Sequence, residues 1–179
     1  MARDDGFDCV TYCETVLAAA IAHNIGEFET TLREIRYHNG IVTWRERNHY
    51  FFEWGEHNVE NKVCKPVMMD GSVELDKTVY WHKELGKRHF AMQVIPYAVF
   101  LARKSELMNG DIVGFVTHRP DLDYFHVGFV IFGPNGELLL RHAAKSHHRV
   151  LDERMDRFIA INGVGYVTLL RPQEPLNAA

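Results

Sequence analysis

The sequence predicts an α+β fold, in which helices form the first part of the chain and antiparallel strands form the second. Two segments, residues 8–23 and 26–40, carry apolar side chains at helical spacing. The C-terminal half instead holds short apolar segments separated by turns such as Gly-Pro-Asn-Gly at residues 133–136. Helices followed by a run of strands are typical of an α+β layout.

The first helix is expected to begin after Asp8, because aspartate is a favoured N-cap residue. This start places Cys9 in the first helical turn. The second helix is expected over residues 26–40, with the Asn39-Gly40 pair as its stop signal.

The middle of the chain mixes irregular and strand-like sequence. Residues 41–70 are rich in aromatic and polar side chains without a clean period, and we expect an irregular aromatic insertion there. Residues 72–81 and 87–95 are expected to form short strands. A helix over residues 96–110 would begin with Pro96 in its first turn.

Four strands are expected in the C-terminal half. One of them is apolar on both faces, which is typical of a central strand. The next alternates instead, with Leu138, Leu140 and His142 on one side. The four predicted strands cover residues 111–118, 126–132, 137–143 and 163–172.

Length and composition indicate one domain spanning residues 1–179, because this length buries a sizeable core and no repeat or flexible linker divides it. The net charge of −4 argues against a broad nucleic-acid surface, which needs clustered Lys and Arg. No stretch approaches the ~20 consecutive apolar residues of a membrane span. The N-terminal residues lack the apolar region of a signal peptide, so we expect none within this sequence.

Three cysteines, Cys9, Cys13 and Cys64, leave at least one thiol free. Cys9 and Cys13 are four residues apart on a helix, a spacing that a disulfide does not easily close. A zinc site needs several ligands at close spacing, and neither this pair nor His147 and His148 has them. We therefore expect no metal and no cofactor, and we interpret Cys13 as a core residue.

Two histidines are predicted to face each other across a hairpin. If its turn is centred on Pro134, residues whose numbers sum to 268 are opposite, and His126 faces His142 on one side of the sheet. A loop one residue longer or shorter would put the two rings on opposite faces. The pairing therefore depends on the length of the turn.

Cys9, His126 and His142 together match the requirements of a cysteine hydrolase. The thiol must ionise, which a helix N-terminus and a neighbouring imidazolium both promote. One histidine must exchange protons with the thiol and the leaving amine, and a third polar group must orient that ring. The alternative is that each residue is structural, as buried cysteines and strand histidines usually are.

The same residues resemble a known pattern. The segments DCVTYCE (8–14), NGDIVGF (109–115) and HVGFVI (126–131) resemble the signatures of NlpC-type papain-like cysteine peptidases. The segment IRYHNGIVTWRERNHYFFEW (35–54) is similar to a region of the branch known as N-acetylmuramoyl-L-alanine amidase-like. The resemblance runs from about residue 8 to about residue 171.

The resemblance implies a papain-like fold, with the cysteine helix packed on an antiparallel sheet, and metal-free hydrolysis of amide bonds in bacterial cell-wall peptides. Cys9 would be the nucleophile, His126 the general base and acid, and His142 the orienting residue. The backbone N–H of Cys9 would contribute to an oxyanion hole.

The resemblance also points to substrate-binding residues in the segment 41–70, which would line the cleft. These candidates are Arg47, His49, Tyr50 and Trp54. The alternative interpretation places Tyr50 and Trp54 in the core and pairs Arg47 with an acid.

The expected partner is a peptidoglycan fragment or another small amide or peptide substrate, without nucleic acid. The family suggests the periplasm or cell envelope, with the cytoplasm left open. An acyltransferase or thioesterase would use the same Cys–His chemistry with another acyl acceptor. A non-catalytic peptidoglycan-binding module would keep the fold alone.

Overall fold

The computed structural model describes residues 6–174. Within them, eight strands form one sheet in which every pairing is antiparallel. The strand order is β2-β3-β8-β4-β5-β6-β7, and β1 pairs with β8 outside this path. The strands are β1 (Cys64–Pro66), β2 (Val73–Val79), β3 (Arg88–Pro96), β4 (Ile112–Val116), β5 (Tyr124–Phe132), β6 (Leu138–Ala144), β7 (Arg149–Arg154) and β8 (Tyr166–Pro172).

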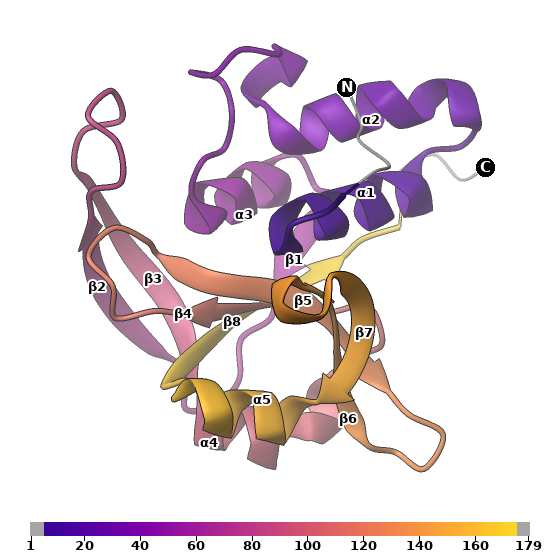
Figure 1. The fold of residues 1–179 in the computed structure, drawn as a ribbon, viewed down its shortest axis with the longest axis vertical. Coiled ribbons are helices and arrows are strands. Elements are labelled where there is room, and N and C mark those ends of the chain that lie inside the picture. The colour runs from indigo at the N-terminus through magenta and orange to yellow at the C-terminus, as the bar shows by residue number, and fades with distance from the viewer. Residues whose placement is uncertain (1–5, 175–179) are drawn as a thin grey trace.

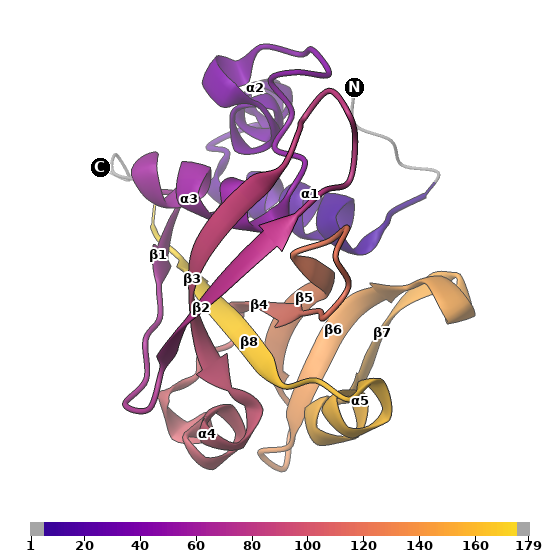
Figure 2. The ribbon, with the colours of Figure 1, turned by 90° about the vertical axis from the view of Figure 1, so that its left-hand side faces the viewer.

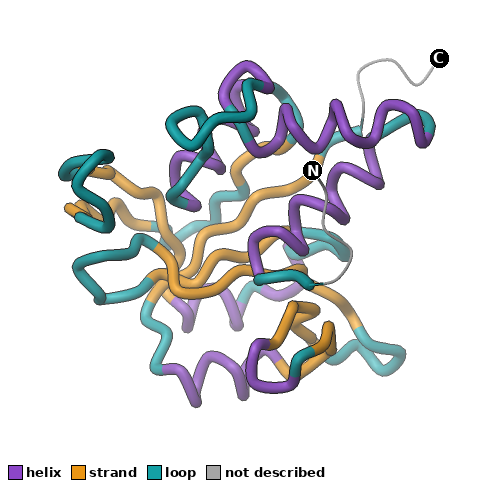
Figure 3. Tube along the Cα trace, turned by 45° about the horizontal axis from the view of Figure 1, so that its top comes forward, coloured by secondary structure: helices purple, strands orange, loops and turns teal. Residues whose placement is uncertain are grey.

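The helices lie on both sides of this sheet. Three helices cover one side: α1 (Cys9–Ile21), α2 (Ile25–Arg36) and α3 (Phe51–Glu60) (Figures 1 and 2). Two shorter ones lie on the other side: α4 (Tyr97–Ala102) and α5 (Met155–Asn162). The strands form the layer between the two groups, as the tube in Figure 3 shows. Three single 3-10 turns connect elements: η1 (His38–Gly40), η2 (Lys104–Glu106) and η3 (Lys145–His147).

The two sides of the sheet have separate hydrophobic cores. The core under α1–α3 includes Leu17, Ile35 and Trp54, whereas the core over α4 and α5 includes Phe100 and Met155. Strand β4 is buried along its whole length and supplies residues alternately to the two cores. A strand covered on both faces has this continuous apolar pattern, which places β4 at the centre of the fold.

Helix α1 begins where the sequence predicts, and its start is fixed by a capping box. The Asp8 carboxylate accepts a hydrogen bond from the backbone N–H of Thr11 (2.7 Å), and the Thr11 hydroxyl accepts one from the backbone N–H of Asp8 (2.9 Å). These bonds satisfy two of the N–H groups that a helix start leaves unpaired. Cys9 is therefore the first helical residue.

Three predicted helix boundaries differ from the structure. Helix α2 ends at Arg36, before the expected Asn39-Gly40 stop, and those two residues belong to the turn η1 with positive φ angles. Pro96 is the N-cap of α4 rather than a residue of its first turn, and α4 ends at Ala102 instead of continuing to residue 110. The shifts at Arg36 and Pro96 are small because helix ends fray and tighten over one turn. The end of α4 shifts further because the chain continues after it as the separate 3-10 turn η2.

The expectation of an irregular segment over residues 41–70 is wrong in its second half, which contains α3 and β1. The buried face of α3 includes the polar side chains of His57 and Asn58. These side chains hydrogen-bond the carbonyl oxygens of Glu34 and Ile35 on α2. A helix that buries polar side chains in this way has no clear apolar period.

The β5–β6 hairpin also differs in register from the prediction. Phe132 pairs with Leu138 and Phe129 with Arg141, so paired numbers sum to 270 and the five-residue turn is centred on Asn135 instead of Pro134. A shift of two keeps every side chain on its predicted face. His126 and His142 thus share a face as diagonal neighbours rather than as directly opposed residues.

Candidate active site

The first feature of the site is the N-terminus of α1, which holds the Cys9 thiol against strand β5. Burial raises the pKa of this thiol above its ordinary value of 9.0, and the nearby Asp8 carboxylate raises it further. Hydrogen bonding from the backbone N–H groups of Val127 and Val10 acts in the opposite direction. The balance keeps Cys9 a protonated thiol in the free protein.

The second feature is a direct hydrogen bond between two histidines. His126 Nε2 lies 2.6 Å from His142 Nδ1, and the two rings are nearly perpendicular. His142 is buried, and burial lowers the pKa of both imidazoles, that of His126 to about 4. Both rings are therefore neutral near pH 7, so one nitrogen of the pair donates and the other accepts.

The acidic residue Glu153 of β7 lies behind this pair. Its Oε1 atom is 3.0 Å from His142 Nε2, and Glu153 raises the pKa of His142 against the effect of burial. A carboxylate at this nitrogen favours the tautomer with the proton on Nε2. His142 Nδ1 then accepts from His126 Nε2–H, which leaves the lone pair of His126 on Nδ1.

A β-bulge lies next to His126. Phe115 pairs with His126, but the next residue of β4, Val116, pairs with Tyr124, so Phe125 is an extra residue in β5. Bulges bend a strand locally and change the direction of neighbouring side chains, and they are common beside functional sites. The bulge thus changes the direction in which the His126 side chain points from β5.

Cys9 and His126 line one pocket of about 740 Å³ at the N-terminal end of α1. Its walls come from the chain before α1, from β5, and from the β6–β7 connection. The remaining lining residues are Gly6, Phe7, Asp8, Phe125, Ala143, Ala144, Lys145, His148, Arg149 and Val150. The volume is typical of a site for a small molecule or peptide.

The pKa directions contradict one expectation about the ionisation of Cys9. A neighbouring imidazolium was expected to help ionise the thiol, but a histidine whose pKa is about 4 is neutral near pH 7. The raised pKa of Cys9 agrees with this. The physical cause is desolvation, which disfavours the charged form of both groups.

Two of the four predicted substrate-binding residues are buried in the core. Tyr50 and Trp54 are each 1% exposed. The Tyr50 hydroxyl accepts a hydrogen bond from the backbone N–H of Trp81 (3.1 Å), and Trp54 stacks on Phe51. In this structure neither side chain reaches the pocket of Cys9, because each is enclosed by its neighbours.

The other two predicted residues lie outside that pocket. Arg47 Nη1 is 2.8 Å from Oε1 of Glu14, a fully buried acid of α1 that also binds Arg36. His49 is half-buried and packs between the rings of Trp44 and Trp81. A role of the four residues in substrate binding stays a prediction.

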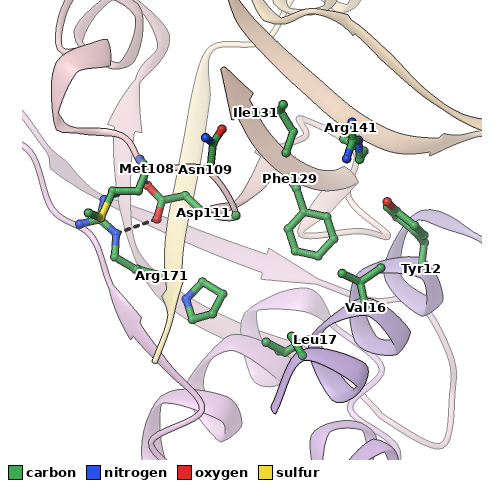
Figure 4. A pocket seen from close by; sticks show the side chains of 13 residues that line it. Tyr12, Val16, Leu17, Met108, Asn109, Asp111, Phe129, Ile131, Arg141 and Arg171 are labelled. Carbon is green, nitrogen blue, oxygen red and sulfur yellow. Dashed lines mark hydrogen bonds and ion pairs between the residues drawn. The ribbon is translucent and has the colours of Figure 1, made fainter. Parts of the chain in front are cut away.

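A second pocket of about 450 Å³ lies further along α1, between that helix and strand β5 (Figure 4). Tyr12, Val16 and Phe129 give it a mainly apolar wall. Its buried carboxylate, Asp111, is paired with Arg171 through both oxygens, at 2.7 and 2.8 Å. Neither Cys9 nor either histidine lines this pocket, so we place the candidate chemistry in the pocket of Cys9.

Other sequence predictions can be placed in the structure. Asp111 stabilises the turn before β4, because its Oδ2 accepts a hydrogen bond from the backbone N–H of Met108 (2.8 Å). Cys13 and Cys64 are buried free thiols. His147 and His148 are exposed.

Across residues 6–174, no group of three or more His, Cys, Asp or Glu side chains could hold a metal ion. No helix in that range has the length and apolarity to cross a membrane.

Glu153 is a candidate functional residue that was not predicted from the sequence. It belongs to β7, a strand that was not predicted because the segment Arg-Val-Leu-Asp-Glu-Arg carries charges on both faces. The only signal was the short distance in sequence to the preceding predicted strand. A hairpin from residue 144 to 149 brings Glu153 diagonally across from His142.

Comparison with known structures supports the fold. A protein of Legionella pneumophila str. Philadelphia 1 matches 97% of this chain and 78% of its own, with a TM-score of 0.82 and 21% identity. An N-acetylmuramoyl-L-alanine amidase of Bacteroides uniformis ATCC 8492 matches 97% of this chain and 86% of its own, with a TM-score of 0.73 and 21% identity. A Bacteroides fragilis protein named as a candidate xylanase matches 96% of this chain and 88% of its own, with a TM-score of 0.77 and 22% identity.

Sequence comparison identifies the family. No curated protein matches the chain. The model of the AmiA-like family, described as N-acetylmuramoyl-L-alanine amidase-like, matches residues 1–164, which is most of the chain. The protein therefore belongs to the N-acetylmuramoyl-L-alanine amidase-like family.

Proposed function

We propose that the protein is a cysteine amidase of papain-like, NlpC-type fold, which hydrolyses amide bonds in bacterial cell-wall peptides. The observation that carries this proposal is the 2.6 Å hydrogen bond between His126 and His142. His126 also lines one pocket together with Cys9. A thiol at a helix N-terminus, a histidine beside it and a second polar group behind that histidine are the parts of a Cys–His hydrolase.

The first step is proton transfer coupled to nucleophilic attack. Both groups are neutral at rest, so His126 Nδ1 takes the thiol proton of Cys9 as the sulfur attacks the amide carbonyl carbon. The carbonyl oxygen becomes an oxyanion, for which the backbone N–H of Cys9 is the candidate donor. Protonated His126 then gives its proton to the nitrogen of the leaving amine, the C–N bond breaks, and the acyl group remains on the sulfur.

The second step returns the enzyme to its starting state. Water loses a proton to His126 Nδ1 and attacks the thioester carbonyl, and the Cys9 sulfur leaves and recovers its proton from His126. His142 orients the His126 ring and shares its positive charge during both steps. Glu153 supports this role from its position 3.0 Å behind His142.

The family description supports the choice of substrate. An N-acetylmuramoyl-L-alanine amidase cuts the amide that joins the muramoyl acyl group to the alanine nitrogen, and the name of the family is of this kind. In such a reaction the muramoyl part forms the thioester with Cys9 and the peptide leaves as an amine. The named amidase from Bacteroides uniformis, which shares the fold, is consistent with this assignment.

Mass spectrometry of muropeptides incubated with the protein tests the proposal. The parent protein is expected to release peptide from sugar, and Cys9→Ala is expected to lose at least roughly 10³-fold in rate, because the nucleophile is gone. Cys13→Ala is the matched control, since that thiol is buried in the core. Cleavage that survives Cys9→Ala would refute the cysteine mechanism, and the absence of cleavage by the parent would refute the amidase function.

A further inference from the structure

Two loops far apart in sequence bring four rings together at the surface. Trp44 and His49 come from the segment before α3, and Trp81 and His82 come from the tip of the β2–β3 hairpin. The ring centroids are 4.4 Å apart for Trp44–His49, 5.3 Å for His49–Trp81 and 5.1 Å for Trp44–His82. We call these four residues the aromatic platform.

The aromatic platform is exposed, unlike the other tryptophan of the chain. Trp44 is 41% exposed and Trp81 is 47% exposed, whereas Trp54 is 1% exposed. Aromatic side chains dominate buried interfaces because each removes a large apolar area from water. Two neighbouring indoles left half in water therefore mark a surface that a ligand can cover.

Hydrogen bonds hold the two loops in place without a ligand. His49 Nε2 donates to the carbonyl oxygen of Trp44 (2.7 Å) inside the first loop. The backbone N–H of Trp81 donates to the hydroxyl of buried Tyr50 (3.1 Å), which ties the hairpin tip to the residue after His49. The rings are therefore preorganised, and binding costs little ordering of the protein.

The pocket beside the platform combines these rings with polar groups of both charges. It measures about 500 Å³ and is lined by Thr43, Trp44, Arg45, Glu46, His82 and Glu84. Its volume lies within the ~300–1,000 Å³ of small-molecule sites, but the depression is shallow and open to solvent. A protein partner would instead need a broad flat surface of about 800 Å² on each side.

The mixture of charges narrows the chemistry of the ligand. The lining acids Glu46 and Glu84 do not favour an anionic ligand such as nucleic acid or an acidic membrane surface, and Arg45 does not favour a cation. A sugar ring meets these conditions, because it offers a face of C–H groups to an aromatic ring and an edge of hydroxyls to carboxylates, guanidinium and imidazole.

We propose that the aromatic platform and its adjoining pocket form a subsite for a neutral saccharide. The proposal deepens the proposed amidase function, because it assigns the glycan part of the substrate to a place in the structure. Both loops lie on the side of the sheet that carries α1, whose N-terminus holds Cys9 (Figures 1 and 2). A glycan held there and an amide at Cys9 would approach the molecule from the same side.

Isothermal titration of the Cys9→Ala protein with a β-1,4-linked N-acetylglucosamine tetramer tests the subsite without turnover. We expect saturable binding, a rise in Kd of about tenfold for Trp44→Ala or Trp81→Ala, and a larger rise for both together. Tyr97→Ala is the matched control, because this residue of α4 is also an exposed aromatic and lies on the other side of the sheet. Thermal unfolding of each variant separates loss of binding from loss of folding.

Three outcomes distinguish this inference from the proposed function. Binding that depends on both tryptophans, without cleavage of muropeptides by the parent, supports the subsite and refutes the amidase. Cleavage of muropeptides with an unchanged KM in Trp44→Ala/Trp81→Ala, and no tetramer binding by Cys9→Ala, supports the amidase and refutes the subsite. Concentration-dependent dimers that the double variant abolishes would overturn the inference in favour of a contact between copies.

Discussion

At the scale of single residues, the protonation state of Cys9 and His126 determines how the site works. Desolvation disfavours charge on each, so the resting pair is a thiol and a neutral imidazole. The three candidate catalytic residues were predicted from two local features of the sequence. The N-cap Asp8 puts Cys9 at the start of a helix, and a hairpin turn with an odd number of residues puts His126 and His142 on one face of the sheet. Their protonation states do not follow from sequence, because desolvation depends on which segments cover them after folding.

The pH dependence of Cys9 alkylation by iodoacetamide tests this state. Only the thiolate reacts, and a thiol whose pKa is raised above 9.0 stays protonated to higher pH. We expect the rate to be low at pH 6–8 and to rise only above about pH 9. Peptide mapping identifies the alkylated residue. Cys13 and Cys64 are expected to stay unmodified, because both are buried. Fast alkylation at pH 6 that His126→Ala slows would reveal a thiolate–imidazolium pair instead.

Glu153 offers a second prediction at this scale. Without its carboxylate, His142 loses the partner that keeps the proton on Nε2, and the His126 lone pair no longer points reliably from Nδ1. Glu153→Ala is expected to lower kcat by roughly tenfold or more with little change in KM, because the residue orients and does not touch substrate. Kinetics on muropeptides measure both constants.

The control variant for Glu153→Ala is Glu74→Ala, because Glu74 is an exposed acid on β2. Nitrogen NMR of the imidazoles adds a reading that a purely structural role would not change. We expect His142 and His126 both to carry their protons on Nε2 in the parent and to show mixed tautomers in Glu153→Ala. Unchanged tautomers together with unchanged kcat would contradict the orienting role.

At the scale of elements, one buried acid joins three segments near the site. Glu14 of α1 is fully buried and binds Arg36 of α2 at 2.6 Å and Arg47 of the following loop at 2.8 Å. Burial raises the pKa of Glu14, and the two arginines lower it. The cluster therefore depends on both partners to keep the carboxylate ionised within the protein.

Arg47→Met is expected to lower the free energy of unfolding by about 3 kcal/mol, the lower end of the range for breaking a buried ion pair, because Arg36 remains. Urea denaturation measures this value. Arg33→Met on the exposed face of α2 is the matched control. If stability is unchanged and only the KM for muropeptides rises, Arg47 binds substrate as the resemblance implied.

Elements with a regular apolar pattern lie near their predicted positions, whereas α3, β1 and β7 were missed. The capped start of α1 and the strands β4, β5, β6 and β8 lie close to their predicted positions. Helix α3 was missed because its buried face includes His57 and Asn58, whose hydrogen bonds to α2 exist only after folding. Strand β7 was missed because it is an edge strand with charged side chains on both faces.

At the scale of the whole molecule, the α+β class was predictable but the strand order was not. Strand β8, from the C-terminal end of the chain, lies between β3 and β4 and also pairs with β1. Such long-range pairing leaves no local signal in the sequence. The central strands β4 and β8 contribute side chains to the cores on both sides of the sheet, so the two cores share the same strands.

This sharing of strands leads to a test of the single-domain prediction for residues 1–179. Phe100→Ala empties part of the core over α4, and we expect a loss of about 3–5 kcal/mol. In a Trp44→Phe/Trp81→Phe background, Trp54 reports only on the core under α1–α3. If the molecule unfolds as one unit, Phe100→Ala shifts the urea midpoints of Trp54 fluorescence and far-ultraviolet circular dichroism equally. Two separate transitions, with Trp54 unaffected, would mean that the two faces of the sheet unfold independently.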